Sequence, residues 1–186
     1  RESCRRFAAE VLRPTGIQLD RLSAQAVIAP ESPLWSVLKQ FRTLGLGGGA
    51  MIDDPSLSPA ERALTHSIVV EELSAGDVGL FIACALQNIA PSIARAAGRE
   101  DLVEFFAARD EICCLALTEP GCGSDIVAFT EPSYRDPRVK PVLKCRREGD
   151  VYILNGQKSS WVSTGSIAGS ASVYATFENS PVGLAD

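Results

Sequence analysis

The apolar residues of this chain change their spacing near residue 110, and this change limits the folds that the chain can adopt. Before that point they recur at intervals of three and four, which places side chains on one face of an α-helix. After it they alternate every second residue between glycines and prolines, as in β-strands. The sequence therefore predicts an α+β fold, with an all-α domain at residues 1–110 and a β-rich domain at residues 111–186.

The helical spacing is clearest in three runs of the first half. Their apolar positions are Phe7, Val11 and Leu12; Leu34, Val37, Leu38 and Phe41; and Leu64, Ile68, Val69 and Leu73. Ser58 followed by Glu61 has the spacing of a capping box at the start of the third helix. Asp77 is expected to cap the next helix, which runs to about residue 97, and Pro91 should kink or split it.

Five strands are expected in the second half, each bounded by turn residues. They lie near residues 112–118, 142–147, 151–155, 158–164 and 171–177. Asn155 and Gly156 form a pair typical of a two-residue hairpin, which predicts that the third strand turns back into the fourth. The segment from Glu131 to Pro141 carries three prolines and charges of both signs, so an exposed excursion is expected there.

Composition excludes some classes of protein. The chain is 46% hydrophobic and 22% charged with a formal net charge of −5, which is typical of a soluble globular protein and gives no reason to expect a nucleic-acid partner. Its longest strongly apolar run, Val78–Leu86, is much shorter than the roughly 20 residues that a transmembrane helix needs. No membrane span is therefore expected.

The cysteines and the chain start bear on metal binding and location. The six cysteines form no CxxC pair and only His66 could join them, so no metal site is predicted. Reduced thiols in a cytosolic compartment are the expected state. His66 is expected on a helix surface rather than in a catalytic role. Because reduced thiols are expected, a cytoplasmic location is predicted. No initiator Met or targeting segment is recognisable, so the native start is either removed or unobserved, and an organellar matrix is left open.

The segment LTEPGCGSD, from Leu117 to Asp125, carries the strongest functional signal. A buried strand at Ile112–Leu117 is expected to end by Pro120, which cannot donate to a strand ladder. Gly121 and Gly123 lack a Cβ and tolerate positive φ, so the loop can bring successive N–H groups close to an anion or a carbonyl-rich ring. A tight Pro-Gly turn without a ligand is the alternative.

A second segment, DVYILNGQKSSWVST from Asp150 to Thr164, follows some thirty residues later. Trp161 and Ser163 are two residues apart, so they would share one face of the predicted strand. An indole beside a hydroxyl can cover a planar aromatic ligand and hydrogen-bond to one of its heteroatoms. The alternative is a core tryptophan beside an incidental serine.

Together the two segments resemble the acyl-CoA dehydrogenase family of flavoproteins. The family shows a TEPGxGSD motif, matched from Thr118 to Asp125, and then NGxK…W(I/V)(S/T)xG, matched by Asn155, Gly156, Lys158, Trp161, Val162, Ser163 and Gly165. FAAEVLRP at residues 7–14 and EELSAGDVGL at residues 71–80 are similar to the family's amino-terminal helical domain. The resemblance therefore covers essentially the whole chain.

The resemblance implies a fold and an activity. Residues 1–110 would form the amino-terminal helical domain and residues 111–186 part of a middle β-barrel domain, with the family's carboxy-terminal helical domain missing. FAD is the implied cofactor, and the implied reaction is α,β-dehydrogenation of an acyl-CoA thioester with hydride transfer to flavin N5. The same resemblance implies a role in fatty acid metabolism, an electron-transfer flavoprotein or similar acceptor, and a homo-oligomer when full length.

The resemblance also assigns site residues by motif position. The cofactor-binding set is Leu115, Ala116, Leu117, Thr118, Gly121, Gly123, Ser124, Trp161, Val162 and Ser163. Ser124 would also border the acyl-CoA. No catalytic residue is predicted, because the family's catalytic glutamate lies in the carboxy-terminal domain, and Glu119 is given a structural role. Lys158 is left out of the set, because two serines separate it from Trp161 where the family has one residue.

Other roles stay open at this stage. The family's acyl chain lies beside the helix that here carries Phe81, Gln87 and Asn88, for which core packing is the default. Cys122 is interpreted as a spacer in the loop. An oxidase or monooxygenase on the same scaffold is one alternative function. A truncated relative that binds flavin or acyl-CoA without catalysis, or that only pairs with a partner chain, is another.

Overall fold

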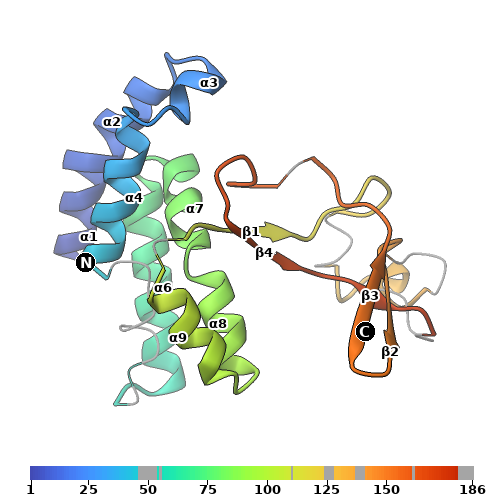
Figure 1. Cartoon of the computed structure of the whole chain (residues 1–186). Coiled ribbons are helices and arrows are strands. Elements are labelled where there is room, and N and C mark those ends of the chain that lie inside the picture. Colours follow the sequence, from blue (N-terminus) through green and yellow to red (C-terminus); the bar gives the residue numbers. More distant parts are fainter. Residues whose placement is uncertain are drawn as a thin grey trace. The chain divides into compact units, whose positions relative to one another are not determined.

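The computed structural model describes residues 1–45, 54, 56–109, 111–123, 128–136, 141–160 and 162–179. These residues divide into two compact units. The helical unit consists of Arg1–Cys113 together with Ser163–Ser170, and the strand unit consists of the described residues of Cys114–Val162 and Ala171–Asp186. The chain is thus a mixture of helices and small sheets, as the change in apolar spacing predicts (Figure 1).

The helical unit contains short and medium-length helices. Their bounds are α1 (Glu2–Phe7), the π-helix η1 (Ala8–Leu12), α2 (Arg13–Leu19), α3 (Ala24–Val27), α4 (Pro33–Thr43), α6 (Pro59–Ser74), α7 (Val78–Leu86), α8 (Ile89–Ala96) and α9 (Glu100–Ala107). In Figure 1, α8 and α9 lie side by side as a helical pair. The three runs with helical spacing in the sequence lie in α1 and η1, in α4 and in α6.

Phe41 is at the centre of the helical core. Its side chain is 1% exposed, and its ring centroid lies 6.1 Å from that of Phe7 and 6.5 Å from that of Phe81. The other predicted positions on α4 are buried with it, and Leu12 and Leu73 are fully buried. Leu64 is an exception, since it is 62% exposed. The buried residues of α6 all lie in its second half, so the predicted apolar face of this helix is wrong at its first turns.

The predicted helix boundaries are confirmed where capping side chains set them. Ser58 and Glu61 form both hydrogen bonds of a capping box at the start of α6. The Asp77 carboxylate accepts the Leu80 N–H at 2.8 Å and so caps α7. The predicted long helix is split into α7 and α8, which are bent by 42°. Pro91 lies in the first turn of α8, where its missing N–H cannot bond the Gln87 carbonyl that would continue α7.

A π-helix interrupts the first helical stretch at Ala8–Leu12. Pro14 follows it, and because proline has no N–H it cannot donate to the Glu10 carbonyl. The widened turn packs tightly against the residues after α6. A Cβ on Gly76 would lie 2.6 Å from the Ala8 carbonyl oxygen and 2.9 Å from the Ala8 Cα. Glycine is therefore required at position 76 by the close approach of two backbones.

One buried carboxylate connects α1 to α6. Glu72 is 7% exposed, and it accepts two hydrogen bonds from the Arg5 guanidinium at 2.8 and 2.9 Å. Arg1 lies 3.1 Å from the same carboxylate. The hydrogen bond from Arg5 is the main reason that the pKa of Glu72 is lowered. This paired geometry explains how a carboxylate is tolerated beside the helical core.

The strand region forms two small sheets. In one, β1 (Cys113–Ala116) pairs with β4 (Ser170–Val173); in the other, β2 (Lys144–Glu148) lies between β3 (Val151–Asn155) and β5 (Thr176–Phe177). The β2–β3 pair is antiparallel, with Cys145 opposite Leu154 and Arg147 opposite Tyr152. Gly149, at φ 60°, forms the turn between these two strands. The β2–β5 pair is parallel.

Two of the strand predictions are wrong. The segment predicted as a strand at 158–164 is not one in its described residues, and Ser163 to Ile167 form turns. Consequently Asn155 and Gly156 do not form a hairpin turn. Instead, β3 pairs with β2, the strand that precedes it in the chain. The predicted strand at 171–177 is divided into β4 and β5, which belong to different sheets. By contrast, the strands predicted near 112–118, 142–147 and 151–155 are confirmed as β1, β2 and β3.

The length and hydropathy of the described helices bear on whether one of them could span a membrane. No single helix in the described part of the chain is long and apolar enough to cross a membrane, and α7 and α8 meet that criterion only as a bent pair.

All six cysteines are buried and none forms a disulfide. Burial raises the pKa of Cys84 to about 12. At about pH 8, a thiol with that pKa is ionised in about one molecule in ten thousand, and only the thiolate is an effective nucleophile. We expect iodoacetamide to leave Cys84 unmodified in the folded chain and to modify it in concentrated guanidinium, as measured by peptide mass spectrometry. Equal modification rates in the two samples would contradict the buried position.

Candidate functional site

The TEPG sequence forms a closed turn at Glu119–Cys122. The Glu119 N–H donates to the Cys122 carbonyl at 2.8 Å, and the Cys122 N–H donates to the Glu119 carbonyl at 3.2 Å. Pro120 and Gly121 occupy the two central positions, where the fixed φ of proline suits a type I or type II turn. Gly121 does not have a positive φ, so a type II turn is excluded. Cys122 is more than a spacer, because its backbone closes the turn and its side chain is buried.

The glycines of this loop are not required by the described fold. Gly121 is exposed, and a Cβ built on it would meet nothing within 4 Å. A Cβ on Gly123 would lie at an ordinary 3.7 Å from the Thr118 methyl group. Neither residue has a positive φ, so the conformational freedom expected of them is not used. What remains is open space over the backbone, which a ligand can approach closely.

Glu119 anchors the turn from below. Its side chain is 1% exposed, and its carboxylate accepts hydrogen bonds from the backbone N–H groups of Val142 and Leu143, the latter at 3.2 and 3.3 Å. The structural role predicted for Glu119 is thus confirmed in its backbone-bonding form. Val142 and Leu143 directly precede β2, so one carboxylate joins the turn to the three-stranded sheet.

Lys158 provides the counter-charge to Glu119. Its ammonium group lies 2.8 Å from a Glu119 carboxylate oxygen and donates to the Leu117 carbonyl at 3.0 Å. The next residue, Ser159, donates its backbone N–H to the Thr118 carbonyl at 2.9 Å. Lys158 was not in the predicted set, although its place in the NGxK motif was the available signal. Its backbone contacts also explain why no strand forms here, since Ser159 bonds to the loop instead of a ladder.

The remaining predicted residues before the turn have a common position. Ala116 is buried on β1, whereas Leu115, Leu117 and Thr118 are half-buried. Among the described residues, the Thr118 hydroxyl has no hydrogen-bond partner. A half-buried hydroxyl without a protein partner is available to a ligand. Ser124, the predicted border with acyl-CoA, lies outside the described residues.

The second predicted segment is only partly described. Trp161 lies outside the described residues; Val162 is half-buried in the strand unit, and Ser163 is exposed in the helical unit. The argument that Trp161 and Ser163 share a strand face loses its basis, because the described residues around them are not in a strand. Thr164 has φ 64° and donates its hydroxyl to the Cys113 carbonyl at 3.1 Å. That contact turns the chain and prevents an extended conformation.

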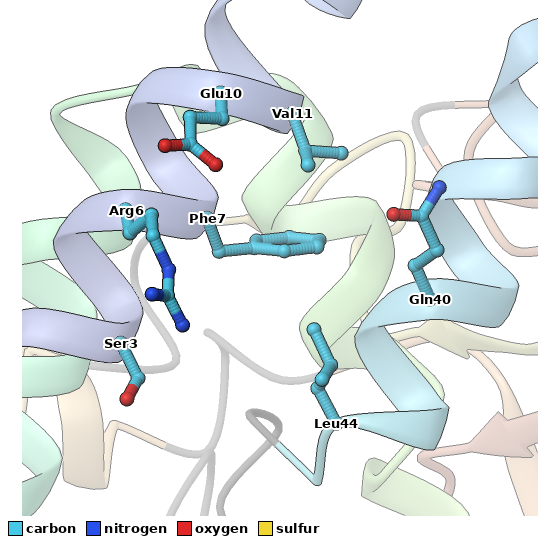
Figure 2. Close-up of a pocket in the computed structure, with 7 residues that line it drawn as sticks. All are labelled: Ser3, Arg6, Phe7, Glu10, Val11, Gln40 and Leu44. Carbon is cyan, nitrogen blue, oxygen red and sulfur yellow. The ribbon is translucent and has the colours of Figure 1, made fainter.

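Two pockets in the described part of the helical unit are lined by residues outside the predicted set. One, of about 300 Å³, is lined by Ser3, Arg6, Phe7, Glu10, Val11, Gln40 and Leu44. Figure 2 shows the Phe7 ring extending between the helix that carries Arg6 and Glu10 and the helix that carries Gln40 and Leu44. Arg6 and Glu10 are exposed, so both charges keep their hydration. Within the described ranges, no cluster of His, Cys, Asp or Glu could hold a metal ion.

Gln87 is a buried polar residue whose hydrogen bonding was not predicted from the sequence. It lies at the break between α7 and α8 and is 8% exposed. Its amide nitrogen donates to the Cys84 carbonyl at 3.3 Å, while its buried Oε1 has no hydrogen-bond partner among the described residues. Phe81, by contrast, is packed in the helical core as expected by default.

The fold and the turn define a mixed helical and β protein with a ligand-accessible TEPG loop. The scan of protein families found no matching model. Curated relatives do match. A probable medium-chain specific acyl-CoA dehydrogenase from Caenorhabditis briggsae is 29% identical over 86% of the chain, and the short-chain specific enzyme from Rattus norvegicus is 29% identical over 97%. Isobutyryl-CoA dehydrogenase from Dictyostelium discoideum is 30% identical over 74% of the chain.

The chain is therefore a homologue of the acyl-CoA dehydrogenases, which confirms the resemblance carried by its two motifs. It spans 30 to 40% of the length of these relatives.

Proposed function

We propose that this chain is the flavin-binding part of an FAD-dependent acyl-CoA dehydrogenase. The observation that carries the proposal is the Glu119–Cys122 turn, which is fixed from one side by Glu119 and open over Gly121 on the other. Homology over most of the chain to enzymes named for acyl-CoA substrates supports it. The proposal concerns the activity of a complete enzyme. This chain matches less than half of the length of each relative.

The residues present fit a flavin. The half-buried Thr118 hydroxyl is left without a protein partner, and no Cβ fills the space over Gly121. We propose that these two groups would lie along the pyrimidine end of the isoalloxazine ring and toward the pyrophosphate of FAD, with Leu115 to Leu117 along the ring. Gly123, Ser124, Trp161, Val162 and Ser163 complete the proposed set by motif position, and Ser124 also borders the substrate.

The chemistry divides between cofactor and chain. Bound FAD supplies the acceptor for the hydride that leaves the β carbon of the acyl thioester. The residues of this chain bind and orient: the turn holds backbone close to the ligand, and the Thr118 hydroxyl donates or accepts one hydrogen bond. None of the residues assigned here removes the α proton.

The remaining features of the proposal rest on the resemblance carried by the two motifs. We propose a middle β-barrel that the two small sheets begin, with a domain boundary at residues 110 and 111 and a carboxy-terminal helical domain in the complete protein. We also propose a homo-oligomer and an electron-transfer flavoprotein or similar acceptor. All three relatives are named as mitochondrial proteins. This gives no support to a cytoplasmic location, so we propose the organellar matrix.

Flavin binding by the purified chain tests the proposal directly. The chain is titrated with FAD while the quenching of flavin fluorescence and the shift of its visible absorbance are followed. We expect saturable binding at one FAD per chain. A chain that is colourless after purification and leaves the FAD spectrum unchanged would contradict the proposal. Oxygen consumption by the reduced full-length protein, with and without acyl-CoA, separates a dehydrogenase from an oxidase or monooxygenase.

Replacing Gly121 with alanine should separate folding from binding. Because the added Cβ meets nothing within 4 Å and φ is not positive, the free energy of unfolding should be unchanged or raised by up to about 1 kcal/mol. If the flavin lies over this turn, the same methyl group collides with it. We expect the Kd for FAD to rise about tenfold, which is about 1.4 kcal/mol of binding free energy.

Gly149→Ala is the matched control for this substitution. Gly149 lies in the β2–β3 turn at φ 60°, with open space around it. Alanine there should lower the free energy of unfolding by about 1 kcal/mol through backbone strain. Its Kd for FAD should equal that of the unmodified chain. A Gly121→Ala chain that binds FAD as tightly as the unmodified chain would remove the turn from the proposed site.

A further inference from the structure

The ion pair between Glu119 and Lys158 is the most deeply buried one in the described part of the strand unit. The two side chains are 1% and 13% exposed, whereas the other ion pair of the same 2.8 Å length in this unit, Arg146–Glu148, is 42% and 58% exposed. Burying charges is costly unless each is paired and hydrogen-bonded. Because water reaches the Glu119 and Lys158 charges so little, hydrogen bonds within the protein must stabilise them.

The hydrogen bonds of the pair join three separate stretches of chain. The Glu119 carboxylate accepts the N–H groups of Val142 and Leu143. The Lys158 ammonium donates to the Leu117 carbonyl at 3.0 Å. The pair thus connects the strand that enters the loop, the segment before β2, and the segment after β3. The Leu143 N–H is buried, so without Glu119 it would be an unpaired donor.

These bonds fix the loop on both sides of Thr118. The Leu117 carbonyl is bonded by Lys158, the Thr118 carbonyl by the Ser159 N–H at 2.9 Å, and Glu119 by the segment before β2. The Thr118 backbone carbonyl is occupied by Ser159, whereas the Thr118 hydroxyl is available to a ligand. The position of the Thr118 backbone, from which that hydroxyl projects, therefore depends on Lys158, although Lys158 itself bonds to Leu117 and Glu119 on either side of it.

We infer that Glu119 and Lys158 are a positioning pair that holds the Glu119–Cys122 turn in its flavin-binding shape, so that Lys158 sets FAD affinity through the turn. This inference rests on the proposed flavin site and extends it to a residue outside the motif-assigned set. It predicts that the turn is loosened by loss of the lysine charge even when no flavin is present. That second consequence makes the inference testable apart from the proposed function.

The test uses four variants of the 186-residue chain. Lys158→Met removes the ammonium group at similar length, and Glu119→Gln removes the carboxylate charge while keeping one acceptor oxygen. Lys158→Arg restores a cation with several donors. Glu148→Gln is the matched control, since it makes the same substitution in an exposed ion pair of equal length.

Hydrogen exchange without flavin is the first measurement. We expect amide exchange in the peptide spanning residues 115–123 to accelerate about tenfold in Lys158→Met and Glu119→Gln, because the hydrogen bonds that close the turn then open locally. Lys158→Arg and Glu148→Gln should exchange like the unmodified chain. Unchanged exchange in both Lys158→Met and Glu119→Gln would overturn the inference, whether or not the chain binds FAD.

The Kd for FAD is the second measurement. We expect it to rise about tenfold in Lys158→Met and to return to within about threefold of the unmodified value in Lys158→Arg, comparable to the loss of a supporting partner in metal sites. Faster exchange with an unchanged Kd would overturn the inference, as would a Lys158→Arg chain as weak as Lys158→Met. If Lys158→Met does not fold, Glu119→Gln and Lys158→Arg decide the question. Failure of the unmodified chain to bind FAD would instead overturn the proposed function.

Discussion

The chain with Phe41 replaced by alanine should unfold with about 3–5 kcal/mol less free energy than the unmodified chain. Phe41 is 1% exposed and contacts the rings of both Phe7 and Phe81. Removing its ring leaves a cavity between α4 and its neighbours, and a helical core relaxes only partly into such a space. Urea denaturation followed by far-ultraviolet circular dichroism measures the difference, because most of the ellipticity comes from the helical unit.

Leu44→Ala is the control for the loss of a large apolar side chain near the same helix. Leu44 follows α4 and is 58% exposed. Its replacement should change the free energy of unfolding by no more than about 0.5 kcal/mol. A Phe41→Ala chain as stable as Leu44→Ala would show that α4 is not central to the core.

Gly156→Ala should be the most damaging single change in the strand unit, lowering the free energy of unfolding by about 3 kcal/mol or more. Gly156 has φ 146°, a conformation that alanine rarely adopts. In addition, its Cβ would lie 2.5 Å from the Leu143 Cα and 2.9 Å from the Val142 carbonyl oxygen. Both contacts are with backbone, so no side-chain rotation can relieve them.

The Gly156→Ala change should also disturb the loop. Val142 and Leu143 donate their N–H groups to Glu119, so displacing this segment weakens the anchor of the Glu119–Cys122 turn. Hydrogen exchange of residues 141–160 measures the effect. Gly149→Ala, with a positive φ but open space, isolates the cost of strain alone. Equal stability of the two variants would show that the contact with Leu143 is not as close as described.

The helical half of the fold could be predicted from the sequence because its signals are local. Ser58, Glu61 and Asp77 each form their hydrogen bonds within three residues of their own position. Pro91 acts on the helix that contains it. The exposure of Leu64 could not be predicted in this way, since spacing shows which residues share a face but not how far a neighbouring helix extends along it.

The strands after residue 155 were predicted less well because distant partners decide them. The sequence predicts Gly156 as a hairpin residue, but in the structure its lack of a Cβ permits close contact with the Leu143 backbone. Lys158 and Ser159 bond to Leu117 and Thr118, some forty positions earlier. Period-two alternation cannot show whether a backbone N–H meets a neighbouring strand or a loop. The division of residues 171–177 between two sheets has the same cause.

The candidate site shows the same contrast. The TEPG motif predicted the turn, and the structure places it between β1 and the sheet as a closed unit. The expected use of positive φ at Gly121 and Gly123 is wrong, because neither glycine has a positive φ. The anchoring of Glu119 by Val142, Leu143 and Lys158 depends on three-dimensional proximity, and no spacing in the sequence encodes it.

The threading of the two units constrains how the chain is synthesised and cut. Ser163–Ser170 belongs to the helical unit, while the residues on both sides of it belong to the strand unit. Ile167 from this returning segment packs against the helical core, and the Gly169 N–H donates to the Ile112 carbonyl at 3.0 Å. During synthesis, the helices α1 to α9 are therefore made before Ile167, which packs against their core. A single cleavage of the chain therefore cannot separate the two units. The packing of the helical unit is complete only after Ser163–Ser170 has been synthesised.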